Sequence, residues 1–269
     1  MILGDGIATL VLDDPATPAR DSPRPYLHPV RTPGGVVVSD LRPPDHDWHL
    51  GLSLTVANLR VGDEAPDANL WGGVTWVTGE GYRQLDNNGS QRVLGQSGSA
   101  LDLGWFAADG RLLLRERRRH EVSLPAAGVA VLDIASEWTP GVPGLRFGSP
   151  TTAGRADAGY GGLFLRLAPD FAQARVLSPT GETTAEAARG ASAPWLALAT
   201  GAATVAIAAS ATNPVTPSPW FVRTEPTPML CAAPFFHDEW PLDGPAAWGW
   251  RVLLADGALD AERIAAVLR

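Results

Sequence analysis

The fold is decided between residues 100 and 122, where the chain reads ALDLGWFAADGRLLLRERRRHEV. Apolar residues alternate with polar or charged ones in Ala100–Ala107 and in Arg111–Val122, the period of a β-strand with one buried face. Between the two runs, Asp109-Gly110 favours the positive φ angles of a tight hairpin turn. The stretch therefore predicts two antiparallel strands and not a helix.

Similar segments recur on both sides of this hairpin, separated by turns. The 29 glycines and 24 prolines in 269 residues fit many short elements joined by tight turns. Only Leu259–Leu268 has apolar residues at helical spacing, with Asp260 as its cap. The further strands we expect are Ile7–Leu12, Gly35–Ser39, Gly51–Leu59, Gly73–Tyr82, Gly128–Trp138, Gly161–Ala168, Ala174–Leu177, Trp195–Thr200, Thr204–Ser210, Trp220–Arg223, Met229–Phe236 and Ala247–Leu254.

These elements predict an all-β fold, a two-sheet antiparallel super-sandwich with a short C-terminal helix. So many strands need two large packed sheets, and 45% hydrophobic residues supply the core between them. The chain shows no repeat period and no linker of low complexity. We therefore predict that residues 1–269 form a single β super-sandwich domain.

Charge and composition exclude several classes of partner. The net charge is −8, and such an acidic protein repels phosphate backbones, so we expect no nucleic acid. The lone Cys231 excludes an internal disulfide framework. The uncharged stretch 193–211 approaches a membrane span in length, but Thr200-Gly201 interrupts it, so we predict two buried strands and no membrane partner. With no signal-peptide pattern at the N-terminus, we expect a cytoplasmic protein. The absence of lysine beside abundant Arg, Ala, Gly and Pro is typical of a GC-rich bacterial genome.

The densest cluster of chemically able side chains consists of His28, Asp45, His46 and His49. Three of the five histidines fall within 22 positions, in segments stiffened by proline. Imidazoles titrate near neutrality, and a neighbouring carboxylate can fix their tautomer, which suits acid–base catalysis. We predict that these four residues are catalytic. The alternative is a surface loop whose histidines are solvated or cap strand ends.

A metal site is a second alternative for the same cluster. Asp45, His46 and His49 could supply oxygen and nitrogen ligands, and His28 could join them. A helix would bring the i and i+3 histidines together, but the prolines argue against a helix, and a strand would point them to opposite faces. We expect no cofactor and leave a divalent metal open.

The strand at 111–122 carries a second polar group. Glu116, Arg118 and His120 share one of its faces, which cannot lie in an apolar core without paired charges. A wall of a ligand pocket and a solvated edge strand protected by charge are equally compatible with this pattern.

Several motifs resemble a bacterial family usually labelled methane-oxygenase-PmoA-like. They are His-Pro-x-x-Thr-Pro-x-Gly at 28–35, Pro-x-Asp-His-x-x-His-x-Gly-Leu at 43–52 and Asn-Leu-Trp at 69–71, followed by segments at 161–166, 181–195 and 213–223. Members typically have Asp-His-x-His-His, where this chain has Trp48 in place of the first of the two adjacent histidines. The resemblance implies a soluble protein similar to galactose mutarotases and, by association, a role in carbohydrate metabolism.

The resemblance and the side-chain chemistry together suggest a sugar site. Tryptophans stack on the apolar faces of sugar rings, and arginine forks donate to hydroxyls or carboxylates. We predict that the substrate-binding residues are Arg31, Trp48, Trp71, Glu116, Arg118, Arg166 and Arg223.

The predicted function is acid–base chemistry on a sugar or keto-glycoside, by epimerisation, elimination or hydrolysis. The alternative is a non-catalytic sugar-binding protein, in which aromatics and arginines would matter and histidines would not. The expected partner is a small carbohydrate, and a homodimer is left open.

Overall fold

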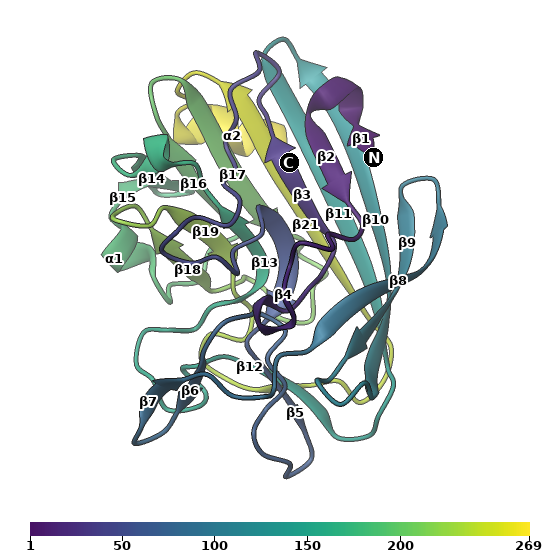
Figure 1. Cartoon of the computed structure of the whole chain (residues 1–269). Helices are drawn as coiled ribbons and strands as arrows, with labels where there is room; N and C mark the ends of the chain where they lie inside the picture. The colour runs from purple at the N-terminus through teal and green to yellow at the C-terminus, as the bar shows by residue number, and fades with distance from the viewer.

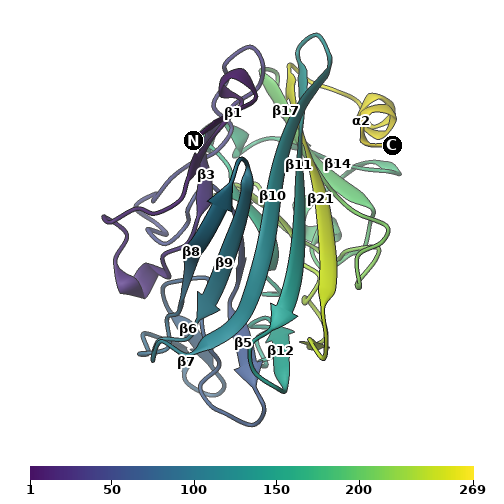
Figure 2. The same cartoon turned by 90° about the vertical axis from the view of Figure 1, so that its right-hand side faces the viewer.

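Two large antiparallel sheets pack face to face in the computed structural model, which describes all 269 residues (Figures 1 and 2). The smaller sheet has seven strands in the order β1-β2-β3-β4-β13-β19-β18. The larger has nine, in the order β15-β14-β16-β17-β21-β11-β10-β9-β8. The predicted all-β super-sandwich is confirmed.

The strands of the smaller sheet are β1 (Ile2–Leu3), β2 (Ala8–Val11), β3 (Tyr26–Val30), β4 (Leu52–Val56), β13 (Gly161–Arg166), β19 (Met229–Ala232) and β18 (Trp220–Arg223). Those of the larger sheet are β8 (Ser90–Ser97), β9 (Ala100–Phe106), β10 (Leu112–Ala126), β11 (Val129–Pro140), β14 (Arg175–Ser178), β15 (Gly181–Thr183), β16 (Trp195–Ala199), β17 (Ala203–Ala209) and β21 (Ala246–Asp256). One minor sheet contains β20 (Trp240–Pro241), β12 (Leu145–Gly148) and β5 (Asn58–Val61). The other contains β6 (Thr75–Val77) and β7 (Gly81–Arg83). The α-helices are α1 (Ala185–Ala188) and α2 (Ala261–Leu268).

Each large sheet has one face toward the common core and one face away from it. On β13, Leu163 and Leu165 join the core between the sheets, whereas Phe164 belongs to a separate apolar cluster on the outer face. Side chains of a strand alternate between faces, so Arg166 also lies on the outer side. This outer face of the smaller sheet carries the candidate site.

The outer face of the larger sheet is covered at one end by α2, as Figure 2 shows. Asp260 caps the helix by accepting a hydrogen bond from the Arg263 backbone N–H at 2.8 Å. Ile264 is fully buried against this sheet with Leu253 and Ala255. The predicted C-terminal helix is confirmed, although it begins at Ala261.

Some strand predictions were wrong where local sequence patterns misled. The segment Tyr26–Val30 forms β3 although it contains Pro29, because a register shift in the pairing with β2 accommodates the residue without an N–H. Gly35–Ser39 forms only isolated bridges through Val37 and Ser39. The edge strand β8 was missed because its polar composition and Gly95 resemble a loop.

The uncharged stretch 193–211 forms β16 and β17, the two buried strands that the sequence predicts. No helix of the structure has the length and apolar character needed to cross a membrane.

A buried ion pair lies on the core side of β10. Arg118 donates from Nε and Nη2 to the two carboxylate oxygens of Glu116, both at 2.7 Å, and Trp105 and Ser136 also donate to this carboxylate. Glu116 and Arg118 are therefore buried between the sheets, where Arg118 borders only a void of about 10 Å³, and β10 is not an edge strand. Reciprocal pairing is what allows these charges to lie between the sheets.

Both large sheets combine strands from the N-terminal and C-terminal halves of the chain. The single-domain organisation stays a prediction, to be tested by whether either half unfolds cooperatively when expressed alone.

Replacing Glu116 by Gln should destabilise the fold strongly. Gln keeps the shape of the side chain but leaves the Arg118 charge buried without a counter-charge, at a cost of about 3–5 kcal/mol. The matched control is Glu137→Gln, which breaks the exposed pair with Arg119 and should cost less than about 1 kcal/mol. Urea unfolding measures both, and equal losses would contradict the account.

His120 should make the protein less stable in mild acid. Burial, reinforced by the positive charge of Arg118, lowers the His120 pKa to about 4 from the ordinary 6.5. Between pH 6.5 and 4 the histidine is protonated in the unfolded chain but still neutral in the native state. The free energy of unfolding therefore falls as the pH drops through this range, by about 3 kcal/mol in all. Urea unfolding of His120→Phe against wild type should show a smaller loss over this window. An equal loss of stability in both proteins between pH 6.5 and 4 would contradict this role of His120.

Candidate functional site

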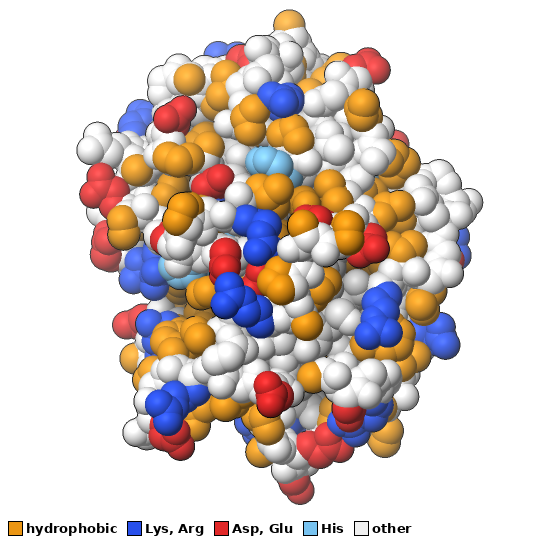
Figure 3. Space-filling model, viewed as in Figure 1, with side chains coloured by type: hydrophobic (Ala, Val, Ile, Leu, Met, Phe, Trp, Pro, Cys, Tyr) orange, Lys and Arg blue, Asp and Glu red, His pale blue; other side chains and the backbone are white.

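A cavity of about 180 Å³ opens on the outer face of the smaller sheet. In Figure 3, which has the viewpoint of Figure 1, arginine and acidic side chains lie close together on this side of the molecule. The cavity takes residues from the 46–49 loop, from the chain around β6 and β7, from the segment before β13, and from β18 and β19. Its lining consists of His46, Trp48, His49, Trp71, Val74, Tyr82, Arg155, Tyr160, Phe221, Arg223 and Met229.

The 40–51 loop forms a narrow hairpin that brings two histidines together. The backbone N–H groups of Gly51 and Arg42 donate to the carbonyls of Asp40 and His49, and the His49 N–H donates to the carbonyl of His46. This last bond is a turn between residues i and i+3, so the imidazoles stack with centroids 4.6 Å apart and planes at 15°. A single turn therefore brings the two histidines together, although the sequence seemed to require a helix for this.

The protonation of His46 follows from its partner Asp45. The two are joined at 2.7 Å between Oδ2 and Nδ1, and Arg166 donates to the other oxygen, Oδ1, at 3.0 Å. Burial raises the Asp45 pKa, but the bond to His46 and the charge and bond of Arg166 outweigh it, so the pKa is lowered. An ionised carboxylate only accepts, so Nδ1 of His46 carries the proton. Nε2 of neutral His46 is then a free proton acceptor.

His49 has the opposite tautomer because its partner is a guanidinium. Arg166 Nη1 lies 3.5 Å from Nδ1 of His49, and a guanidinium has donors but no acceptor. Nδ1 must therefore carry the lone pair and Nε2 the proton. Burial lowers the His49 pKa well below its usual value, and the charge that His46 carries when protonated and the charges of Arg166, Arg24 and Arg223 lower it further. His49 is thus a neutral hydrogen-bond donor beside a proton acceptor.

Aromatic side chains form the walls around this pair. Asn69 Oδ1 accepts from the backbone N–H groups of Trp71 and Gly72, which fixes the turn that presents the Trp71 indole. Trp48 packs on Gly73, where a Cβ would lie 2.5 Å from the indole and where φ is +65°. Only glycine allows this approach.

A nearly complete match links the chain to a known family: the family model covers residues 2–269. The chain belongs to DUF6807, a family of unknown function. No curated protein matches it. The resemblance to the methane-oxygenase-PmoA-like family is therefore wrong, since short motifs carry less weight than a match over the whole chain. The family description names no activity, so the site geometry alone indicates what this DUF6807 chain does.

Most of the predicted site residues meet at the cavity. His46, His49, Trp48, Trp71 and Arg223 line it. Asp45 bonds the imidazole of His46, and Arg166 contacts both Asp45 and the imidazole of His49. The Arg166 side chain is 4% exposed.

Four predicted residues of this DUF6807 chain do not join the cavity: Glu116 and Arg118 are buried between the sheets, and His28 and Arg31 belong to the β3 segment. His28 lies on β3, two strands away from β13, where Nδ1 bonds Ser39 Oγ at 2.8 Å. Arg31 follows β3 and bridges to Val37. Neither lines the cavity, because β4 separates their strand from the one that carries Arg166.

Other site residues were missed from the sequence. Tyr82, Arg155, Tyr160 and Met229 reach the cavity from separate segments that no motif connects. Arg24, buried beneath the loops, donates to the backbone carbonyls of Trp48 and Trp71, both at 3.0 Å. An arginine that binds carbonyls leaves no charge pattern in the sequence, so only the fold reveals that it ties these two loops together.

No three His, Cys, Asp or Glu side chains of the described chain are placed to hold a metal ion. In the cluster weighed as a metal site, the Asp45 carboxylate is engaged by His46 and Arg166.

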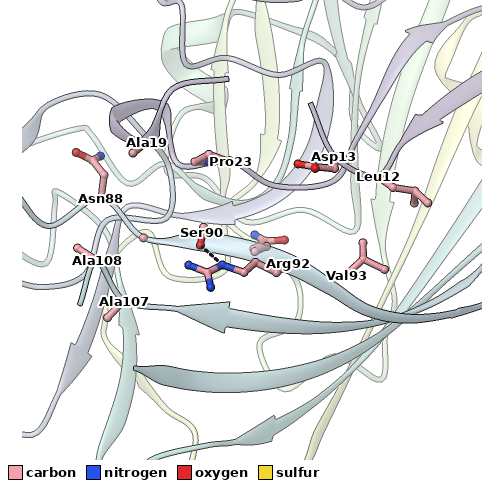
Figure 4. A pocket seen from close by; sticks show the side chains of 12 residues that line it. Leu12, Asp13, Ala19, Pro23, Asn88, Ser90, Arg92, Val93, Ala107 and Ala108 are labelled. Atoms are coloured by element: carbon pink, nitrogen blue, oxygen red, sulfur yellow. Dashed lines mark hydrogen bonds between the residues drawn. The ribbon is translucent and has the colours of Figure 1, made fainter. Parts of the chain in front are cut away.

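A larger cavity of about 500 Å³ lies between β8 and the N-terminal segment (Figure 4). Asp13 and Arg92 are its only charged lining residues, and Arg92 bonds Ser90 at 3.2 Å. It offers no proton acceptor paired with a fixed donor. The smaller cavity is therefore the better candidate for chemistry.

The opposite tautomers can be tested directly by NMR. Long-range ¹H–¹⁵N correlations should show His49 as the Nε2–H tautomer, still neutral as the pH falls through 6.5, because its pKa is lowered well below that value. Arg166→Met removes the donor to Nδ1 and should abolish the preference. A His49 that carries its proton on Nδ1, or that gains a second proton near pH 6.5, would contradict the assignment.

Proposed function

We propose that this chain is an enzyme that removes a proton from the carbon next to a carbonyl group of an oxidised sugar. The observation that carries the proposal is the pair of imidazoles stacked 4.6 Å apart at one cavity, to which Asp45 and Arg166 assign opposite tautomers. One member accepts a proton and the other donates a hydrogen bond. Abstraction of an acidified C–H needs these two functions and no strong nucleophile.

The proposed step begins at His46. Its Nε2 takes the proton from the carbon, the C–H electron pair forms the C=C bond of an enolate, and the carbonyl π pair moves to oxygen. The Nε2–H of His49 stabilises that oxygen by a hydrogen bond. Return of the proton to the other face gives an epimer. In elimination, the enolate oxygen pair re-forms the carbonyl, the enolate C=C pair forms a double bond to the β-carbon, and the β-substituent leaves with its bond pair. The proton held by His46 then passes to the leaving group, and a keto-glycoside is cleaved when that group is the glycosidic oxygen.

The neutral state of His49 favours this chemistry over epimerisation at the anomeric carbon of an aldose. That reaction requires full proton transfer to the ring oxygen, for which a cationic imidazolium is the suitable acid. A neutral imidazole is a poor acid but a good hydrogen-bond donor to a developing oxyanion. Burial and the nearby charges of Arg166, Arg24 and Arg223 keep His49 neutral while His46 acts as the base.

The size and walls of the cavity support a sugar as substrate. About 180 Å³ corresponds to roughly six water molecules, which suits one sugar ring and not an oligosaccharide. Trp48 and Trp71 provide apolar surfaces of the kind that stack on sugar rings. We place the activity in cytoplasmic carbohydrate metabolism, a proposal that the single reduced, buried cysteine fits.

A non-catalytic sugar-binding protein is the second candidate. The aromatic walls and the arginines of the cavity would serve binding alone equally well. The two candidates differ in whether the tautomers of His46 and His49 matter.

The test is to incubate the protein with keto-glycosides and with simple aldoses, and to follow products by ¹H NMR. We expect conversion of a keto-glycoside, with His46→Ala lowering the rate by roughly two to four powers of ten. Asp45→Asn should also lose activity, because the amide does not hold the Nδ1–H tautomer. The control is His237→Ala, an exposed histidine outside the cavity. Ligand that binds but is never converted would establish the binding protein instead.

A further inference from the structure

Three arginines converge beside the cavity without a carboxylate partner. Arg155 and Arg223 line it, and Arg189 lies behind them. None of the three forms an ion pair within 4.0 Å, and the groups with the largest electrostatic effect on Arg223 are the other two arginines and two tyrosines, with no carboxylate among them. In a protein with net charge −8, carboxylates are plentiful elsewhere, so their absence at this point is a property of the site.

Aromatic rings and backbone hold these arginines in place of counter-ions. The guanidinium carbons of Arg189 and Arg223 lie 5.9 and 5.2 Å from the ring centre of Phe221. The Arg189 side chain also donates to the Val222 carbonyl. Since neither carries an ion pair, their charges repel one another in a half-buried place. An anion at this position would relieve that repulsion.

An aromatic ring also holds Arg155, which lies in the segment before β13. Its guanidinium lies 4.6 Å from the ring centre of Tyr82 and donates to the Tyr82 hydroxyl. That hydroxyl is 3.0 Å from the hydroxyl of Tyr160. Burial, followed by Tyr82, raises the Tyr160 pKa well above its usual value, so its hydroxyl keeps a proton to donate.

The arginines and the imidazoles occupy separate parts of the lining. Trp71 lies 5.6 Å from His49 and 4.7 Å from Tyr160, which in turn is 5.5 Å from Phe221. Trp71 and Tyr160 thus connect His49 to Phe221, against which Arg189 and Arg223 pack. One sugar ring could place its reacting carbon at the imidazoles and a charged substituent at the arginines.

We propose that Arg155 and Arg223, backed by Arg189, bind an anionic group of the sugar, a carboxylate or a phosphate. Arginine forks match both groups with paired, charge-assisted hydrogen bonds. The substrate class is then an acidic or phosphorylated monosaccharide. The inference rests on the proposed function only in taking the ligand to be a sugar.

The test is calorimetric titration with glucuronate, glucose 6-phosphate and inorganic phosphate, with glucose as the neutral reference. At least one anionic sugar should bind about ten- to a hundredfold more tightly than glucose. Arg223→Met should remove most of that difference. Arg155→Met, in a loop, provides the same readout should the first variant not fold. The matched control is Arg115→Met, an exposed arginine on the larger sheet.

The outcomes separate this inference from the proposed function. Equal binding of glucose and both anionic sugars, or no binding of any anionic probe in the millimolar range, overturns the anion site. Tighter binding of glucuronate supports a carboxylate, and tighter binding of glucose 6-phosphate supports a phosphate. His46→Ala should keep the anion affinity. Should His46→Ala also keep full turnover, the proton-abstraction proposal fails while the anion site stands.

Discussion

Arg166 has only hydrogen-bond donors, and its position at the end of β13 imposes that property on the whole site. One end of the guanidinium holds an oxygen of Asp45 at 3.0 Å, and Nη1 faces Nδ1 of His49 at 3.5 Å. The carboxylate held in this way accepts a hydrogen bond from the Nδ1–H of His46, and the guanidinium excludes a proton from Nδ1 of His49. A single nearly buried cation thereby makes two stacked, chemically identical rings into a proton acceptor and a hydrogen-bond donor. Replacing it would disturb both tautomers at once.

The sandwich architecture allows polar side chains to cluster at this site without disturbing the core. Large apolar side chains and the Glu116–Arg118 ion pair fill the core between the sheets, and their packing stabilises the fold. The outer face of the smaller sheet is free to carry Arg166, Arg223 and Phe164 at alternating positions of its strands. Loops then complete the cavity, tied down by Arg24 and Asn69. Residues that bind and react therefore lie apart from those that fold the protein.

Strand periodicity predicted the architecture because alternation is a local property of the chain. It failed for β3, where Pro29 disguises a paired strand, and for β8, which is too polar to stand out. The cluster Asp45, His46 and His49 was visible because its members are close in sequence. Tyr160 and Arg155 were not, because only the pairing of β13 with its neighbours brings the segment before it to the cavity. The pairing of Glu116 with Arg118 likewise depends on which face of β10 meets the core, which the sequence leaves undecided.

The central claim is that His46 takes a proton from carbon while His49 stabilises the adjacent oxygen. The most direct measurement is the release of label into water from a methyl keto-glucoside deuterated at the carbon next to its keto group, followed by ²H NMR. The account predicts that the wild-type protein releases the label far faster than buffer does, and that His46→Ala, correctly folded, does not. Conversion of the glycoside with the label retained on carbon, or equal release by both proteins, would contradict it.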